Sequence, residues 1–191
     1  RVIGEGHVLF PGFNTRYALE GVVSVEPLRN KYYEELLALV DYPDIGWGWL
    51  RLISSNQISS RSASLDMMGV GYIVAKVGTV MPDDMTLVHS SDLDVWQRKS
   101  VWPRAFFANN VLEIRESTFT HRCCIADIRN ALSNSNNTPF AAVESDLMKN
   151  IVLDTTAKYE VIPAREYLIT SNKTEFTVDA SGPGIVVLGE I

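Results

Sequence analysis

The pattern of polar and apolar residues changes near residue 150, and this change constrains the fold more than any single motif. After Ile151, polar turns such as Ser171-Asn172-Lys173 separate short strand-like segments, in which Tyr159 and Val161 alternate with polar neighbours. Alternation at a period of two is typical of antiparallel strands that expose one face of their sheet to water. The four segments predicted to be strands are residues 158–163, 166–170, 175–179 and 185–189.

Before residue 150 the sequence mixes helix and strand periodicities. An amphipathic helix is expected between Pro27 and Pro43, because Leu28, Tyr32 and Leu36 recur on one helical face. Residues 54–64 carry six serines and are expected to form a loop, after which Ser64 caps a short helix through Leu65, Met68 and Val70. Further elements are expected as strands at residues 2–10, 19–25, 72–75, 87–89 and 103–108, and as a helix at residues 123–132.

These two patterns predict an α+β fold rather than a winding of βαβ units. Residues 1–150 are expected to form a mixed α/β region, packed with a mainly antiparallel β-sheet formed by residues 151–191. With 191 residues, of which 46% are hydrophobic, both parts can share one core. The chain opens inside an apolar run and stops inside a strand-like run, so we expect it to be a single domain of a larger protein.

Charge and composition narrow the classes of partner. A net charge of -6 argues against nucleic acid, which rewards a basic protein face. No run approaches the ~20 apolar residues that span a bilayer. Cys123 and Cys124 are adjacent, and a disulfide between neighbours is strained, so two reduced or buried thiols are expected.

The sequence predicts no catalytic residue, no metal site and no cofactor. His7, His89 and His121 show no metal-ligand spacing, and no phosphate-binding glycine loop or Gly-x-Ser-x-Gly motif is present. Paired carboxylates, among them Asp92 with Asp94, lie in or beside predicted turns, where a solvated role is the simpler interpretation. A thiol hydrolase that uses Cys123 or Cys124 ranks last, because His121 would point in a different direction on a helix.

The tryptophans allow two interpretations. Trp47, Trp49 and Trp96 could line a groove that stacks on sugar faces, or they could fill the core, as large aromatic side chains commonly do. Arg104 is either a structural ion-pair partner or an anion contact. A carbohydrate-binding or adhesion module is therefore the alternative function. The candidate ligand-binding residues are Trp47, Trp49, Trp96, Arg104, Asn14 and Tyr17.

Two segments, Pro103-Arg104-Ala105-Phe106-Phe107 and Met68-Gly69-Val70-Gly71-Tyr72-Ile73-Val74, carry a family resemblance. Read together, they resemble the extracytoplasmic C-terminal region of YfhO-like bacterial membrane proteins, which are of the GT-C glycosyltransferase type. Shorter blocks look like other pieces of that family, among them Pro11, Asn14, Tyr17-Ala18-Leu19-Glu20-Gly21, Glu26-Pro27-Leu28, Tyr32-Tyr33, 159–162 and 175–191. Residues 41–62 match nothing in the family pattern, and its closing Pro-Gly-Trp is absent.

The resemblance implies a soluble domain on the extracytoplasmic side of a bacterial membrane. Its implied partners are the transmembrane portion of the same polypeptide and a glycan or lipid-linked sugar. The family's catalytic groups are expected in its membrane part and first outer loop, so no catalytic residue is carried over. The implied role is to position an acceptor or to support the membrane part of a cell-envelope glycosyltransferase.

Overall fold

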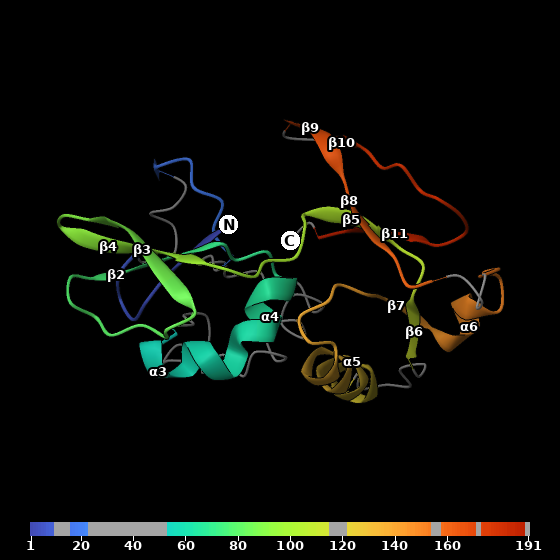
Figure 1. Ribbon diagram of the computed structural model, residues 1–191, viewed down its shortest axis with the longest axis horizontal. Coiled ribbons are helices and arrows are strands. Elements are labelled where there is room, and N and C mark those ends of the chain that lie inside the picture. Colours follow the sequence, from blue (N-terminus) through green and yellow to red (C-terminus); the bar gives the residue numbers. More distant parts are fainter. Residues whose placement is uncertain (10–15, 23–52, 115–121, 154–157, 171–172, 190–191) are drawn as a thin grey trace. The chain divides into compact units, whose positions relative to one another are not determined.

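The computed structural model describes residues 1–9, 16–22, 53–114, 122–153, 158–170 and 173–189, and every structural statement below concerns these ranges. The fold is α+β with mainly antiparallel strand pairing, as the sequence predicts. The chain divides into two compact units, Arg1–Val101 and Trp102–Glu190, which we call the N-terminal and C-terminal units. Figure 1 shows the elements of both units.

The N-terminal unit is built on a four-stranded sheet with the strand order β1-β2-β4-β3. β1 pairs with β2 in parallel, and β2, β4 and β3 pair in antiparallel fashion. The strands predicted at residues 2–10, 72–75 and 87–89 are confirmed, but the first is short because the chain turns at Gly6, where φ is +56°. The strand bounds are β1 Val2–Gly4, β2 Tyr72–Lys76, β3 Met85–Ser90 and β4 Leu93–Arg98.

A short helical run covers one face of this sheet (Figure 1). It comprises α3 Ser55–Ile58, the 3-10 helix η1 Ser59–Arg61 and α4 Ser62–Met67. The predicted loop at residues 54–64 is therefore wrong, and Ser64 lies inside α4 rather than at its cap, whereas the short helix predicted through Leu65 is present as α4. The helical run starts after Ser54, whose backbone N–H donates to the Gln57 side chain at 3.2 Å, one half of a capping box.

The core of the N-terminal unit lies between the helical run and the sheet. Leu65 and Val70 are completely buried, as are Ile73 and Ala75 on alternate positions of β2. This alternation shows that β2 has one covered face, since Tyr72 and Lys76 are exposed. The remaining buried members of this core are Ile3, Val22, Ile53, Ile58, Met68, Met81 and Met85.

The C-terminal unit contains a three-stranded antiparallel sheet with β5 Ala105–Ala108 at its centre. Its outer strands are β8 Val161–Pro163 and β11 Ile185–Leu188. All four residues of β5 are buried, so the strand predicted at residues 103–108 is confirmed as a central strand. β9 Arg165–Thr170 and β10 Lys173–Thr177 form a separate hairpin, and the four predicted tail strands thus belong to two sheets.

Between β5 and β8 the chain forms a βαβ unit that the sequence did not predict. β6 Val111–Ile114 and β7 Ala141–Glu144 pair in parallel, and α5 Arg122–Asn134 connects them in sequence. α5 confirms the helix predicted at residues 123–132. It ends in a turn where Asn136 and Asn137 adopt positive φ, and α6 Ser145–Met148 follows β7.

The predicted domain boundary at residue 150 is not the place where the contacts of the chain divide. The first unit ends at Val101 and the second begins at Trp102. β5, which precedes residue 150 in the sequence, pairs with β8 and β11, which follow it. A single domain with a shared core stays a prediction.

Two predicted elements fall wholly or partly outside the described residues. The helix expected between Pro27 and Pro43 lies outside them. Of the strand expected at residues 19–25, only Leu19–Val22 is described, and Gly21 forms a bridge with Val2. None of the described helices has both the length and the apolar composition needed to cross a membrane.

Candidate functional site

The described residues among those predicted to bind a ligand belong to different elements of the chain. Tyr17 is 63% exposed in a turn of the N-terminal unit, and Trp96 lies in β4 of the same unit. Arg104 immediately precedes β5 in the C-terminal unit, where its carbonyl oxygen accepts a hydrogen bond from the Gly189 N–H at 2.7 Å. Asn14, Trp47 and Trp49 lie outside the described residues.

Trp96 packs against the core of the N-terminal unit. It stands opposite Ile73 on β2 and Leu87 on β3, which places it on the covered face of the sheet. Its indole N–H is buried and meets no acceptor among the described residues. This position agrees with the core interpretation of Trp96, whereas the stacking platform with Trp47 and Trp49 stays a prediction. Glycan binding that is lost on Trp47→Ala and Trp49→Ala would support the platform.

The most polar buried cluster joins α4 to the end of β4. Asp66 is completely buried and Arg98 is 5% exposed, and Arg98 Nη2 lies 2.7 Å from Asp66 Oδ1. The Ser100 hydroxyl donates to Asp66 Oδ2 at 2.9 Å. Arg98 also donates to the carbonyl oxygens of Ser62, at 2.9 Å, and Val70, at 3.2 Å, so its backbone partners come from the start of α4 and from the segment between α4 and β2.

Burial dominates the electrostatics of this pair. It raises the pKa of Asp66, and the nearby Asp84 carboxylate adds to that rise, while Arg98 and the Ser100 hydroxyl oppose it. Burial also lowers the pKa of Arg98, against the attraction of Asp66 and Asp84. Because the hydrogen-bonding groups of the pair point at backbone and hydroxyl partners within the fold, the cluster serves to hold α4 on the sheet.

Sequence reasoning missed this cluster, although one signal was available. Asp66 interrupts the apolar stripe formed by Leu65 and Met68, and a carboxylate in such a position needs a partner when it is buried. The identity of Arg98 could not be read from the sequence, since 32 positions separate the two residues and they meet only where α4 lies against the end of β4.

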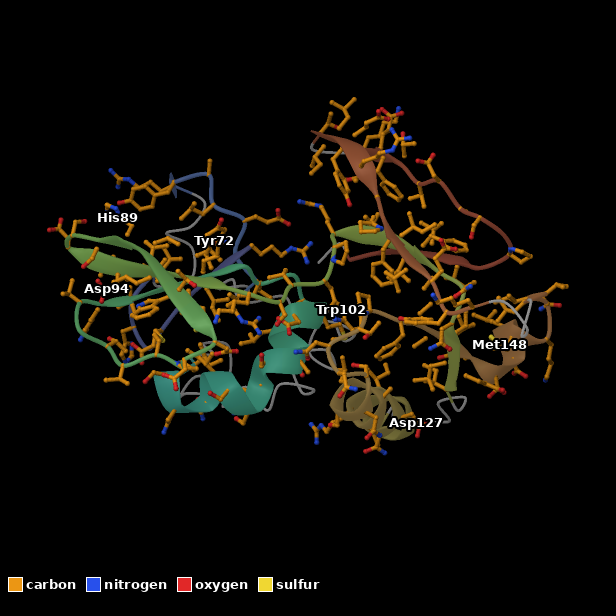
Figure 2. All side chains as sticks on the ribbon, in the orientation of Figure 1. Tyr72, His89, Asp94, Trp102, Asp127 and Met148 are labelled. Atoms are coloured by element: carbon orange, nitrogen blue, oxygen red, sulfur yellow. The ribbon has the colours of Figure 1, made fainter. Side chains whose placement is uncertain are left out.

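A second carboxylate fastens the β3–β4 end of the sheet, where Figure 2 labels Asp94 and His89. Asp94 is 3% exposed and accepts hydrogen bonds from the Ser90 hydroxyl at 2.6 Å and the Gly78 N–H at 3.0 Å. The interpretation of Asp94 as a solvated turn residue is therefore wrong. His89 is exposed, and its Nε2 lies 3.1 Å from the Ser91 hydroxyl, which is a local contact of the hairpin.

In the C-terminal unit, aromatic side chains pack around Trp102, which is labelled in Figure 2. The Trp102 ring meets Phe106 and Phe140 edge to face, with centroids 5.9 Å and 5.2 Å apart. Trp102 is 7% exposed, so this tryptophan fills the core. Nearby, the Tyr167 hydroxyl accepts the Ala105 N–H at 3.1 Å and donates to the Ala105 carbonyl at 3.2 Å, which ties β9 to β5.

Apolar side chains are also exposed on outer strands of the C-terminal unit. Leu168 and Ile169 on β9 are 56% and 48% exposed, and Val186 and Leu188 on β11 are 50% and 40% exposed. Single exposed apolar residues are ordinary. Leu168 and Ile169 are consecutive and point to opposite faces of β9, whereas Val186 and Leu188 share one face of β11 and form a small apolar surface there. Sequence reasoning marked both strands and assigned neither a binding role.

Within the ranges that the structure describes, no group of three His, Cys, Asp or Glu side chains could hold a metal ion. The side chains of Cys123 and Cys124 lie outside the description. No family model, curated protein or solved structure matches the chain.

Proposed function

We propose that the chain is a non-catalytic extracytoplasmic domain of a bacterial multi-pass membrane protein that resembles YfhO-like proteins. In this proposal the parent protein transfers sugars from a lipid-linked donor to a cell-envelope acceptor. The domain positions that acceptor or supports the transmembrane portion of the same polypeptide. The tryptophan platform of a carbohydrate-binding module is the alternative, and it depends on Trp47 and Trp49.

One observation carries the proposal: each of the two segments that bear the resemblance contributes buried side chains to the interior of one unit. Val70 and Ile73 from the first segment are completely buried, and Ala105, Phe106 and Phe107 from the second are at most 2% exposed. Buried positions constrain side-chain volume and shape, so a match there supports a common fold rather than a common reactive site.

The use of the buried polar groups supports the non-catalytic part of the proposal. Asp66 and Arg98 are joined to each other and to Ser100, Ser62 and Val70, and Asp94 is joined to Ser90 and Gly78. A reactive group would instead be poised toward a space that a substrate can enter. These ionisable groups connect elements of the fold.

The reading frame around these 191 residues gives the first test. The proposal expects ten or more apolar spans encoded upstream of Arg1, each of about 20 residues. A reading frame that encodes a soluble protein would contradict it.

Deletion of the domain from the parent protein gives the second test. With residues 1–191 removed, we expect sugar transfer to the polymeric acceptor to fall at least tenfold, an apparent loss of about 1.4 kcal/mol of transition-state binding. Hydrolysis of the lipid-linked donor should continue, because the reactive groups remain in the membrane part. Donor binding and elution in detergent serve as controls for the integrity of that part. Loss of both reactions with donor binding intact would show that the domain carries reactive groups.

A further inference from the structure

β11 forms an edge of the three-stranded sheet, because it pairs with β5 on one side and no strand of the described residues pairs with its other side. Its register with β5 is regular from Ile185, opposite Ala108, to Leu188, opposite Ala105. Val186 and Leu188 are the exposed positions of this strand.

The hydrogen-bond pattern identifies which backbone groups of β11 point outward. The Gly189 N–H donates to the Arg104 carbonyl oxygen at 2.7 Å, so this pair is hydrogen-bonded. In an antiparallel ladder such pairs alternate with non-bonded pairs. Val187 opposite Phe106 is therefore a bonded pair, and the N–H and C=O groups of Val186 and Leu188 point away from β5.

This edge is a short strand of four residues that lacks three features by which proteins protect exposed strands. Proteins commonly place a charged residue, a proline or a bulge on an outer strand to prevent pairing with another chain. β11 reads Ile185-Val186-Val187-Leu188, so it has no charge and no proline, and its register contains no bulge. β9 differs, because Arg165 and Glu166 are charged and its register with β10 shifts.

We propose that two copies of this chain pair in antiparallel fashion through β11, with a two-fold axis at Val187. This register sets Val186 of each copy opposite Leu188 of the other, so the outward N–H and C=O groups of both residues find partners. A second copy suits the edge because the four apolar residues of β11 carry no charge that would repel the same segment of another copy. Pairing joins the two three-stranded sheets into one continuous sheet across the axis.

The mass of the full chain as a function of concentration tests the pairing. Analytical ultracentrifugation should show twice the chain mass of 21.3 kDa at high concentration and the single mass after dilution. Val186→Lys should weaken dimerisation at least tenfold, because it places a charge at the interface. Val80→Lys is the matched control, since Val80 is 85% exposed in the N-terminal unit, and it should dimerise like the unmodified chain. A chain that stays monomeric, or a Val186→Lys variant that dimerises normally, would overturn the proposal.

Cross-linking tests the register and does not depend on the lysine variant folding. In a non-bonded antiparallel pair the Cα atoms lie about 4.5 Å apart, which a disulfide can span. Val187→Cys in a Cys123→Ser, Cys124→Ser background should therefore form a covalent dimer under mild oxidation. Val80→Cys in the same background should not. Equal cross-linking of both variants would overturn the register. Either result leaves the proposed function untouched, because that function does not require a dimer.

Discussion

At the scale of single residues, Gly184 has the least space for a side chain among the described glycines of the C-terminal unit. A Cβ atom there would lie 2.4 Å from the Phe107 ring and 2.7 Å from the Ala108 carbonyl oxygen. Phe107 is 2% exposed and cannot swing away. We expect Gly184→Ala to lower the free energy of unfolding by about 2–3 kcal/mol, measured by urea denaturation.

Gly182 provides a control two residues earlier in the same turn. A Cβ atom at Gly182 meets nothing within 4 Å, so Gly182→Ala should change stability by about 0.5 kcal/mol or less. Equal losses for the two variants would show that the alanine itself, and not the contact with Phe107, destabilises the protein.

The Asp66 carboxyl should make stability depend on pH with a defined sign. Its pKa in the folded protein lies above the ordinary value of 3.8, mainly because of burial. A group with a raised pKa contributes stability below its ordinary pKa and loses that contribution as pH rises through the folded value. The contribution of Asp66 to the free energy of unfolding should therefore decline as pH increases from 3.8 upward.

Comparison with Asp66→Asn isolates this contribution, because the variant keeps the shape of the side chain but cannot titrate. Urea denaturation between about pH 4 and about pH 7 should show a decline in the unmodified chain that is absent in the variant. At the upper end the variant should not be less stable for lack of the carboxylate charge, because the raised pKa of Asp66 means that the folded state favours the neutral side chain. Asp84→Asn should shift the decline to lower pH, because the Asp84 charge helps to raise the pKa of Asp66. Parallel pH curves for the unmodified chain and Asp66→Asn would contradict the assignment.

At the scale of elements, one hydroxyl group fixes the β9–β10 hairpin to the central strand of the C-terminal unit. Tyr167→Phe removes both hydrogen bonds to Ala105, a residue that is completely buried, and leaves its N–H without that acceptor. We expect a loss of about 1–2 kcal/mol and faster hydrogen exchange of the Ala105 amide. Tyr72→Phe should have little effect, because Tyr72 is exposed on the open face of β2. Unchanged exchange at Ala105 in Tyr167→Phe would contradict the role of the hydroxyl.

The elements that the sequence predicted correctly are those whose pattern is local. β2 and β5 are short apolar runs, and α5 shows the helical spacing of Ile128 and Leu132. The start of α3 was missed because serines favour turns as well as caps, although Ser54 and Gln57 form the spacing of a capping box. β4 was missed because its sequence, Leu93–Arg98, does not alternate between apolar and polar residues, and its buried positions are the charged residues Asp94 and Arg98. The Asp66–Arg98 pair and the parallel β6–β7 pairing were beyond reach, since both depend on contacts between distant segments.

At the scale of the whole molecule, each unit buries its own apolar side chains. The core of the N-terminal unit is centred on Leu65 and Ile73, and that of the C-terminal unit on β5 and Trp102. Strands β8 and β11, which the sequence assigned to a separate tail region, enclose β5 instead. The boundary between the parts of the chain that unfold cooperatively is therefore expected between residues 101 and 102 rather than at residue 150.

A substitution confined to one core can locate this boundary. A Cβ atom at Gly4 would lie 1.6 Å from the Val8 carbonyl oxygen, so Gly4→Ala should destabilise the N-terminal unit by about 3 kcal/mol or more. Hydrogen exchange followed by mass spectrometry should then show faster exchange in peptides from residues 1–101 and little change in peptides from residues 102–190. Gly184→Ala should give the opposite distribution. Gly4→Ala could instead accelerate exchange in all peptides up to residue 150 and leave later peptides unchanged. Residues 1–150 would then open as one cooperative unit, and the boundary predicted from the sequence would be correct.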